Sequence, residues 1–484
     1  MTGEPSEGGW EPLLDELRRR QGAARALGGA EKIGRQHAKG KLDARQRLER
    51  LFDPGSFTEL GALVGGLDDL PGDGLVAGLG AVDGRPVLAA AEDFTVRGGS
   101  IGVGNTDKRY RLTQIAGREG LPLVLLLDGA GHRMTGEAAG RRPNDLQGLA
   151  DLKGRVPLVT LVLGPAAGHS ALAAPLADYS VMTERAALFT AGPLLVKAAT
   201  GEDVTPEALG GPQVAVASGV VQDVVPDDDA AIDRARAWIG YFDGQVGEGD
   251  DVGPRPLGDL LEVIPPDPRR PYAMVEVVDR LADVGSVLVA GAGFGGGMLT
   301  ALIRLGGRTV AVVANDPSVR AGAIGRDEAD KAARFLDTVA PFGLPVVFLA
   351  DNPGVMAGTQ AERDGVLGAA AGLFAAQRRY PGSKLHVTVR KAFGFGSSAM
   401  AMNPFDHQTL TLAFPGVLLG AMPAASGGRA AALTADEQAA AEILQAGGPY
   451  RTAHTMGYDD VIDPRDLRDR LLAGLVMAGG QAPR

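Results

Sequence analysis

The sequence predicts an α/β protein built from two copies of one fold, and three observations support this. Residues 82–102 return as residues 305–325 with 10 of 21 positions identical. Residues 121–131 return as residues 344–354 with 6 of 11 positions identical, and the offset between copies is the same for both blocks. Around these blocks, short apolar runs alternate with helical patterns, which is typical of a parallel sheet covered on both faces. A repeat of this length indicates a duplicated domain with a functional cleft between its halves rather than a solenoid.

The composition fits a globular enzyme of two domains. The chain has 484 residues, of which 45% are hydrophobic and 22% charged, and this length exceeds what one hydrophobic core usually holds. The net charge of −11 and the lack of a basic run argue against a nucleic-acid partner. Cysteine is absent, which excludes disulfides, thiol nucleophiles and cysteine-bound zinc. Since no apolar stretch resembles a signal or a membrane span, we expect a soluble cytoplasmic protein with no membrane partner.

The first half is expected to begin with a helical arm. Apolar residues recur at spacings of three and four over residues 11–50, and Pro54 and Gly55 end the pattern. A basic cluster in this arm is typical of a solvated face, with contact to an anionic ligand as the open alternative; its members are Lys39, Lys41, Arg45 and Arg47. After the arm we expect strands at 74–84, 85–93, 121–128 and 157–164, and helices at 106–120, 146–156 and 168–182.

The second half repeats this order. Strands are expected at 309–316, 344–351 and 384–390, helices at 329–343 and 365–379, and a final helix from Pro464. The segment between the halves is rich in proline, glycine and acidic residues, so we place a linker at 255–271. The predicted domains are therefore residues 1–254 and residues 272–484.

A dinucleotide-binding motif is a weaker interpretation of one glycine-rich segment. Gly291, Gly293 and Gly296 follow an apolar run with the spacing of that motif. Only the residues MLTALIRL follow before the second repeat copy begins, and this is too short for the usual crossover helix. We therefore do not favour a nicotinamide enzyme.

Four glycine-rich turns are the predicted location of chemistry. They lie at 128–133, 164–171, 351–359 and 390–400, each after an expected parallel strand, where α/β folds place ligands. Backbone amides in such turns, helped by a following helix, stabilise a developing negative charge as an oxyanion hole does. The alternative, that these glycines only make tight turns, is less favoured because the four turns occupy paired positions.

At these motifs the chain resembles the carboxyltransferase (β) subunits of biotin-dependent acyl-CoA carboxylases, of the propionyl-CoA carboxylase type. The resemblance runs from residues 28–57 to residues 457–471 and so covers nearly the whole chain. Among the matching motifs are PGDGLVAGLGAVDGRPV, FTVRGGSIG, ALFTAGPLLVKAATGEDVTPEALGG, GGRTVAVVAN, ADKAARF and RKAFG followed by SSAMAM.

The resemblance implies two pseudo-symmetric crotonase-like halves from an internal duplication. It further implies an active site between the N-terminal half of one subunit and the C-terminal half of another, in a homo-oligomer such as a hexamer. Carboxybiotin on a separate carrier would pass its carboxyl group to the α-carbon of an acyl-CoA. A thioester enolate and a ureido anion would each need a pair of amides. The chain lacks an ATP-binding glycine loop and a biotin-accepting Met-Lys-Met, so biotin and the biotin carboxylase belong to a partner.

Two turns depart from the family pattern. The family's Gly-Pro-Cys-Ala-Gly-Gly-Ala corresponds here to Gly164-Pro-Ala-Ala-Gly168-His169-Ser170. Its Arg-Lys-Ala-Tyr-Gly-Gly-Ala corresponds to Arg390-Lys-Ala-Phe-Gly394-Phe395-Gly396. Backbone amides survive these substitutions, whereas the space beside them changes.

From these comparisons we assign candidate residues. The catalytic amides are expected at Gly168 and His169 in one turn and at Phe395 and Gly396 in the other. The expected residues for substrate and coenzyme A are Arg97, Gly98, Gly99, Gly131, His132, Gly354, Ser397 and Ser398. His169 as a proton donor or acceptor is an alternative to a purely polar turn residue, and no pair of histidines has metal-ligand spacing. We therefore expect no metal site.

Three functions stay open at this point. The first is acyl-CoA carboxyl transfer with biotin on a carrier. The second is decarboxylation or another enolate reaction of an acyl thioester without biotin. The third is a non-catalytic subunit that assembles with an active paralogue.

Overall fold

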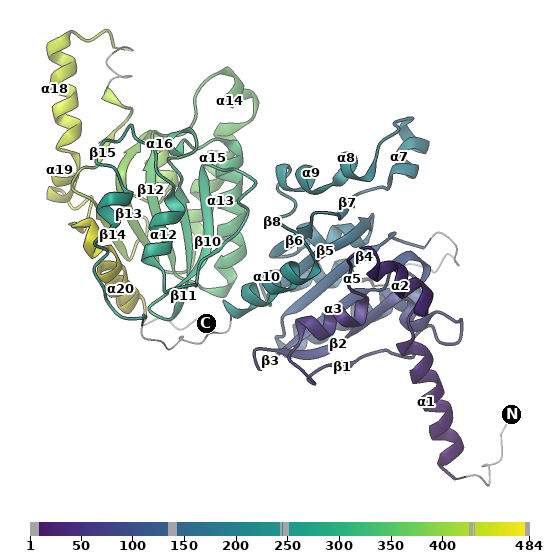
Figure 1. The fold of residues 1–484 in the computed structure, drawn as a ribbon. Coiled ribbons are helices and arrows are strands. Elements are labelled where there is room, and N and C mark those ends of the chain that lie inside the picture. Colours follow the sequence, from purple (N-terminus) through teal and green to yellow (C-terminus); the bar gives the residue numbers. More distant parts are fainter. Residues whose placement is uncertain are drawn as a thin grey trace. The chain divides into compact units, whose positions relative to one another are not determined.

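The chain folds into two compact units. The computed structural model (Figure 1) describes residues 9–133, 143–242, 244, 251–424, 429 and 431–479. The first unit is Met1–Gly240 and the second is Tyr241–Arg484. Each unit contains one eight-stranded sheet.

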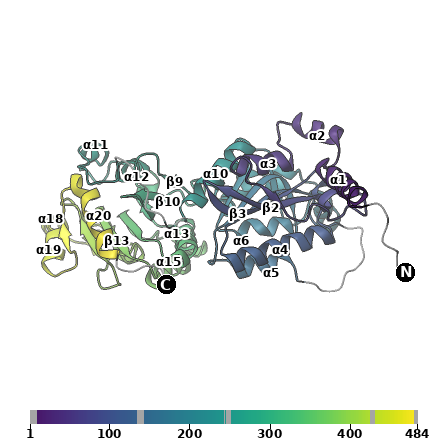
Figure 2. The ribbon, with the colours of Figure 1, turned by 90° about the horizontal axis from the view of Figure 1, so that it is seen from below.

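The sheet of the first unit has the order β1-β2-β3-β4-β5-β6-β8, and β7 pairs with β5. The pairs β1–β2 and β2–β3 are antiparallel and the others are parallel. Figure 2 shows α3 and α10 on one face of this sheet and α4, α5 and α6 on the other. The strands are β1 Thr58–Glu59, β2 Leu75–Val82, β3 Arg85–Glu92, β4 Leu123–Gly129, β5 Leu158–Ala167, β6 Tyr179–Thr183, β7 Ala187–Phe189 and β8 Asp223–Val225. The helices are α1 Glu11–Arg25, α2 Ala30–His37, α3 Ala44–Leu51, α4 Val103–Glu119, α5 Asp145–Leu152, α6 Ala173–Leu176, α7 Pro193–Thr200, α8 Pro206–Gly210, α9 Pro212–Ala217 and α10 Asp228–Gly240.

The sheet of the second unit has the order β16-β14-β13-β12-β11-β10-β9, and β15 pairs with β13. Read from β9, this is the order of the first sheet, again with two antiparallel pairs followed by parallel ones. The strands are β9 Leu288–Val289, β10 Met298–Leu305, β11 Arg308–Asn315, β12 Val346–Asn352, β13 Lys384–Phe393, β14 Leu410–Ala413, β15 Leu418–Gly420 and β16 Asp460–Val461. The helices are α11 Leu260–Val263, α12 Met274–Leu281, α13 Arg326–Val339, α14 Thr359–Arg363, α15 Val366–Arg379, α16 Gly394–Ala399, α18 Ala435–Ala446, α19 Gly448–His454 and α20 Leu467–Ala478.

The duplication holds residue by residue. The strands β2, β3 and β4 precede β10, β11 and β12 by the same offset that relates the repeated sequence blocks. The isolated bridge between Ile101 and His132 returns with this offset between Ile324 and Val355. The offset is slightly longer between β5 and β13, so that Gly168 corresponds to Gly394 and His169 to Phe395. The predicted α/β fold from an internal duplication is thus confirmed.

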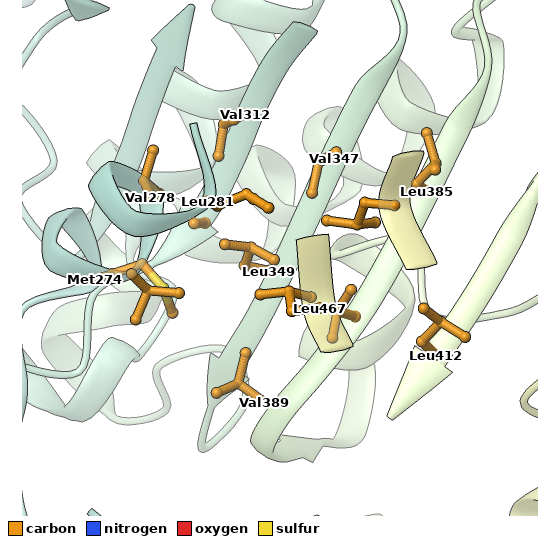
Figure 3. Packing of buried hydrophobic residues seen from close by; sticks show 14 of the residues in the cluster. Met274, Val278, Leu281, Val312, Val347, Leu349, Leu385, Val389, Leu412 and Leu467 are labelled. Atoms are coloured by element: carbon orange, nitrogen blue, oxygen red, sulfur yellow. The ribbon is translucent and has the colours of Figure 1, made fainter. Parts of the chain in front are cut away.

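The core of the second unit shows how strand alternation places side chains. Val347 and Leu349 of β12 pack in one cluster with Met274 of α12 and Leu467 of α20 (Figure 3). Successive residues of a strand point to opposite faces, so the side chains of Val346 and Phe348 point to the other face of the sheet. The strands of both sheets are therefore apolar along most of their length, as expected for sheets covered on both sides.

One predicted helix is wrong in its second half. Residues 168–182 were expected to be helical throughout, but only Ser170–Leu172 and Ala173–Leu176 are helical, and Tyr179–Thr183 forms β6. The strand pairs with both β5 and β8, and Tyr179 and Val181 are fully buried there. Burial between two strands outweighs the helical spacing of the apolar residues. The segment with the dinucleotide-like glycines lies between β9 and β10, which are antiparallel, so no crossover helix follows it.

The boundary between the compact units falls after Gly240. The segment 255–271, which was expected to be a linker, carries α11 and places Leu257, Leu260 and Ile264 in the core of the second unit. The N-terminal arm is helical, as predicted, and consists of the three helices α1, α2 and α3. Gly29 and Gly40 adopt φ of 92° and 71° at the breaks, a conformation that favours glycine.

We expect Leu349→Ala to destabilise the protein by about 2–5 kcal/mol, because it opens a cavity in a fully buried cluster. The matched control is Leu367→Ala on α15, whose side chain is 70% exposed and whose loss should cost less than about 0.5 kcal/mol. Urea unfolding of both variants measures the difference. Similar costs would contradict the placement of β12 in the core.

A second prediction concerns the turn after β4. Gly131 and Gly120 both have positive φ, 82° and 69°. A Cβ on Gly131 would lie 2.6 Å from the carbonyl oxygen of Ala167, whereas one on Gly120 would meet nothing within 4 Å. Both alanine variants carry the strain of positive φ, so Gly131→Ala should cost at least about 1 kcal/mol more than Gly120→Ala. Guanidinium unfolding compares them, and equal costs would show that the turn is not packed against β5.

Candidate active site

In the first unit, the turns that follow β3, β4 and β5 lie side by side at one edge of the sheet. The amide of Ala130 donates to the carbonyl of Gly98 at 2.9 Å, and the amide of Ile101 donates to the carbonyl of Gly131 at 2.8 Å. Gly131 in turn packs directly against Ala167 at the end of β5. The structure therefore brings together the glycines that the sequence predicted in three separate motifs.

Two exposed side chains border these turns. Arg97 begins a short run of left-handed residues, with φ of 51°, that continues through Gly98 and Gly99. His132 follows Gly131 and is exposed. Gly99 has no room for a side chain, because a Cβ there would lie 2.4 Å from the carbonyl oxygen of Asp128.

The turn after β5 offers fewer free amides than expected. Gly168 has φ of 58°, and its N–H donates to the carbonyl of Phe189 at 3.0 Å. The amides of His169 and Gly131, by contrast, find no acceptor among the residues that the structure describes. Of the expected pair Gly168 and His169, only His169 therefore has a free N–H group. The second free N–H group belongs to Gly131, in the turn that packs against the end of β5.

The side chain of His169 is tied to a buried carboxylate. Its Nε2 lies 2.6 Å from Oδ1 of Asp145, at the first residue of α5, where Asp145 is 2% exposed. Burial would raise the pKa of Asp145, but the hydrogen bond from His169 and the charge of Arg109 outweigh burial and lower it. Asp145 therefore stays ionised and fixes the orientation of the imidazole.

The equivalent turn of the second unit begins α16. Its N-cap Phe393 makes no side-chain cap, and the first amides of a helix lack acceptors within the helix. The N–H groups of Phe395 and Gly396 accordingly donate no hydrogen bond within the described part of the chain. Gly396 packs against Asn352 and Gly354, where a Cβ would lie 2.4 Å from Oδ1 of Asn352.

The side chains around α16 line one side of these amides. The ring of Phe395 is 43% exposed and rests on Phe374 of α15, with 5.5 Å between the ring centroids. The hydroxyl of Ser397 donates to the carbonyl of Gly394 at 2.7 Å, and the carbonyl of Ser398 accepts from the side chain of Gln377 at 3.2 Å. Gly354, Phe395, Gly396, Ser397 and Ser398 thus lie together.

A basic cavity of about 660 Å³ opens beside the first site. Five cations line it, together with Phe94 and Asp128; they are Lys32, Arg35, Lys39, Lys41 and Arg185. The sequence pattern singled out Lys39 and Lys41 as possible ligand contacts, but not the other three cations. Arg185 is distant in sequence, and its guanidinium donates to the carbonyl of Lys39 at 3.1 Å, which no sequence pattern reports.

The other members of the predicted basic cluster have structural partners. Arg45 pairs with Glu59 at 2.9 Å. Arg47 is fully buried between Asp128 and Asp228, at 2.9 Å and 2.8 Å. Lys41 both lines the cavity and forms an ion pair with Asp128 at 2.5 Å. Burial lowers the pKa of Lys41 despite the charge of Asp128.

A second cavity of about 660 Å³ lies in the second unit and has mixed charge. Its charged residues are Arg320, Arg326, Asp327, Glu328 and Asp364. The cavity of the first unit is therefore the better match for an anionic ligand. Within the described ranges, acidic and histidine side chains form no cluster suited to a metal ion. The helices described here also include none with the length and apolarity to cross a membrane.

Comparison with known proteins identifies the family of the chain. Residues 35–481 match the carboxyl transferase domain family. The chain is 32% identical to the methylmalonyl-CoA carboxyltransferase 12S subunit of Propionibacterium freudenreichii subsp. shermanii, over 96% of this chain and 94% of that protein. It is 34% identical to the propionyl-CoA carboxylase beta chain of Saccharopolyspora erythraea, over 96% and 92%. It is also 31% identical to the methylmalonyl-CoA decarboxylase subunit alpha of Propionigenium modestum, over 97% and 96%.

A solved structure shows the same fold over the whole chain. The transcarboxylase 12S crystal structure with methylmalonyl-coenzyme A and methylmalonic acid bound superimposes with a TM-score of 0.90 at 31% identity, covering 100% of this chain and 97% of that one. Both units are therefore crotonase-like, as the sequence predicted. The chain belongs to the carboxyl transferase domain family and is a carboxyltransferase subunit of the kind found in biotin-dependent acyl-CoA carboxylases.

Proposed function

We propose that the chain moves a carboxyl group from carboxybiotin, held on a separate carrier protein, to the α-carbon of an acyl-CoA. One observation carries the proposal: equivalent turns of the two duplicated units each present main-chain amides without acceptors among the described residues. His169 provides one in the first unit, and Phe395 and Gly396 provide two in the second. The relatives named for methylmalonyl-CoA and propionyl-CoA support acyl thioesters as the substrate class.

The amides act by stabilising negative charge. In the first unit, the N–H of His169, together with that of Gly131, would hold the thioester oxygen as the enolate forms. A donor of this kind contributes about 2.7–4 kcal/mol to the transition state. In the second unit, the free N–H groups of Phe395 and Gly396 match the carbonyl oxygen of a biotin ring. Biotin, when its carrier is bound, supplies the carboxyl group.

The basic cavity of the first unit fits the phosphates of coenzyme A. Lys32 and Lys39 have no side-chain partner in the described part of the chain, so both are available to a phosphate. Phe94 lies beside them with 37% of its surface exposed, which offers an aromatic face to a base. We assign the nucleotide end of the substrate to this cavity.

The carrier and the biotin carboxylase are separate proteins in this proposal, because the sequence has no lysine in a biotin-accepting motif. The 12S relative assembles as a hexamer. We propose a homo-oligomer of the same kind for this chain.

A second candidate function is decarboxylation of a malonyl-type thioester in the same site. It is favoured by the relatives named methylmalonyl-CoA decarboxylase subunit alpha, from Propionigenium modestum and Veillonella parvula. Loss of CO₂ also produces an enolate, so the same amides would serve it.

The purified chain, supplied with a biotin carboxylase, a biotinylated carrier, ATP and bicarbonate, should carboxylate propionyl-CoA. Incorporation of labelled bicarbonate into methylmalonyl-CoA measures the activity, and omission of the carrier is the control. CO₂ release from methylmalonyl-CoA without any carrier-dependent fixation would instead select the second candidate.

Replacing Lys39 with glutamine should weaken coenzyme A binding about five-fold, which corresponds to roughly 1 kcal/mol for an exposed ion pair. The effect should shrink at high salt, because the contact is electrostatic. Calorimetry with coenzyme A at two salt concentrations measures it. The matched control is Arg118→Gln, an exposed cation that pairs with Glu119, and an equal loss there would contradict the assignment of the cavity.

A further inference from the structure

His169 has the features of a proton-transfer group, and the proposed function does not use them. An ionised carboxylate only accepts hydrogen bonds, so the nitrogen bonded to Asp145 at 2.6 Å must carry the proton. In the neutral imidazole, Nδ1 is then the nitrogen with the lone pair. It has no partner among the described residues and is not among the fully buried nitrogens, so solvent or substrate reaches it.

Asp145 is held in place by the charge of one cation, Arg109, which in turn contacts a buried carboxyl on β3. Arg109 of α4 is 2% exposed, lies 3.7 Å from Asp145 and also hydrogen-bonds the buried Glu92 of β3. Glu92 accepts the amide of Asp128 at 2.6 Å. The imidazole is therefore anchored through a continuous set of buried groups to the strand ends that carry the glycine turns. Such a costly arrangement of buried charge fixes the direction of the ring.

The duplicated unit lacks this arrangement. The residue equivalent to His169 is Phe395, whose ring packs on Phe374. The residue equivalent to Glu92 is Asn315, which accepts the amide of Asp351 at 3.2 Å. The two turns share a backbone, but a titratable side chain is found at this position in the first unit alone.

We propose that His169, positioned by Asp145, moves the α-proton of the bound acyl thioester, and that the chain exchanges this proton with water without a carrier. The inference rests on the proposed function. Nδ1 takes the proton as the C–H bond breaks, and the electron pair moves toward the thioester oxygen held by the amides. The imidazolium is stabilised by Asp145. While it is on Nδ1 the proton is replaced by one from water, and transfer of that new proton to the carbon completes the exchange, so no other reactant is consumed.

Exchange of the α-hydrogens of propionyl-CoA in ²H₂O, followed by mass spectrometry, tests this. His169→Ala keeps the amide and removes the imidazole, so it should slow exchange by about 100-fold or more with little change in propionyl-CoA affinity. Imidazole in the buffer should restore part of the rate. His169→Gln can still donate a hydrogen bond to Asp145 and so keeps the local structure, but it has no base. It should therefore exchange as slowly as His169→Ala, which separates loss of the base from loss of folding.

Asp145→Asn should slow exchange less than His169→Ala, because the base remains and only its positioning is lost. The matched control is His37→Ala on α2, which removes a histidine that also pairs with a carboxylate, Asp43 at 3.2 Å, and should exchange at the wild-type rate. Exchange by His169→Ala within about threefold of wild type would overturn the inference. Carrier-dependent carboxylation without any exchange would also overturn it while leaving the proposed function intact, whereas failure to bind propionyl-CoA would refute both.

Discussion

In each unit, a buried aspartate at the end of one parallel strand forms ion pairs that hold the surrounding segments together. Asp128 of β4 and Asp351 of β12 are equivalent and fully buried. Asp128 binds Lys41 and Arg47 from the N-terminal arm. Removing one partner of such a buried pair typically costs about 3–5 kcal/mol, because the other charge is left without compensation. The arm is therefore fixed to the strand ends that carry the candidate site.

In the second unit, the charge of the buried aspartate is compensated by residues from different elements. Asp351 lies 2.7 Å from Arg390 and 3.3 Å from Lys391, both on β13, and accepts the hydroxyl of Tyr272 at 2.9 Å. The cations that pair with Asp351 thus come from the neighbouring strand, whereas those that pair with Asp128 come from the N-terminal arm. The arm also supplies four of the five cations of the basic cavity beside Asp128, Lys41 among them. Symmetry of the backbone therefore coexists with a different electrostatic environment in each unit.

The sequence predicted the parts of the structure that repeat or alternate. The duplication, the strands and the positions of the glycine turns follow from identities at a fixed offset and from apolar periodicity. It could not predict that Tyr179 enters a strand, since pairing on both sides overrides local spacing. It also could not show that the amide of Gly168 is already bonded to Phe189, or that Arg185 meets the arm. These facts depend on contacts between residues far apart in the chain.

The longer offset between β5 and β13 has a consequence for how the two copies diverged. The three pairs of equivalent strands before them keep one spacing, so the difference in length arises between β4 and β5 and between β12 and β13. The connection that precedes the candidate turn therefore tolerates a change in length that leaves the strand order intact. A duplicated fold with this property can change the surroundings of one turn while both copies keep the same strand order.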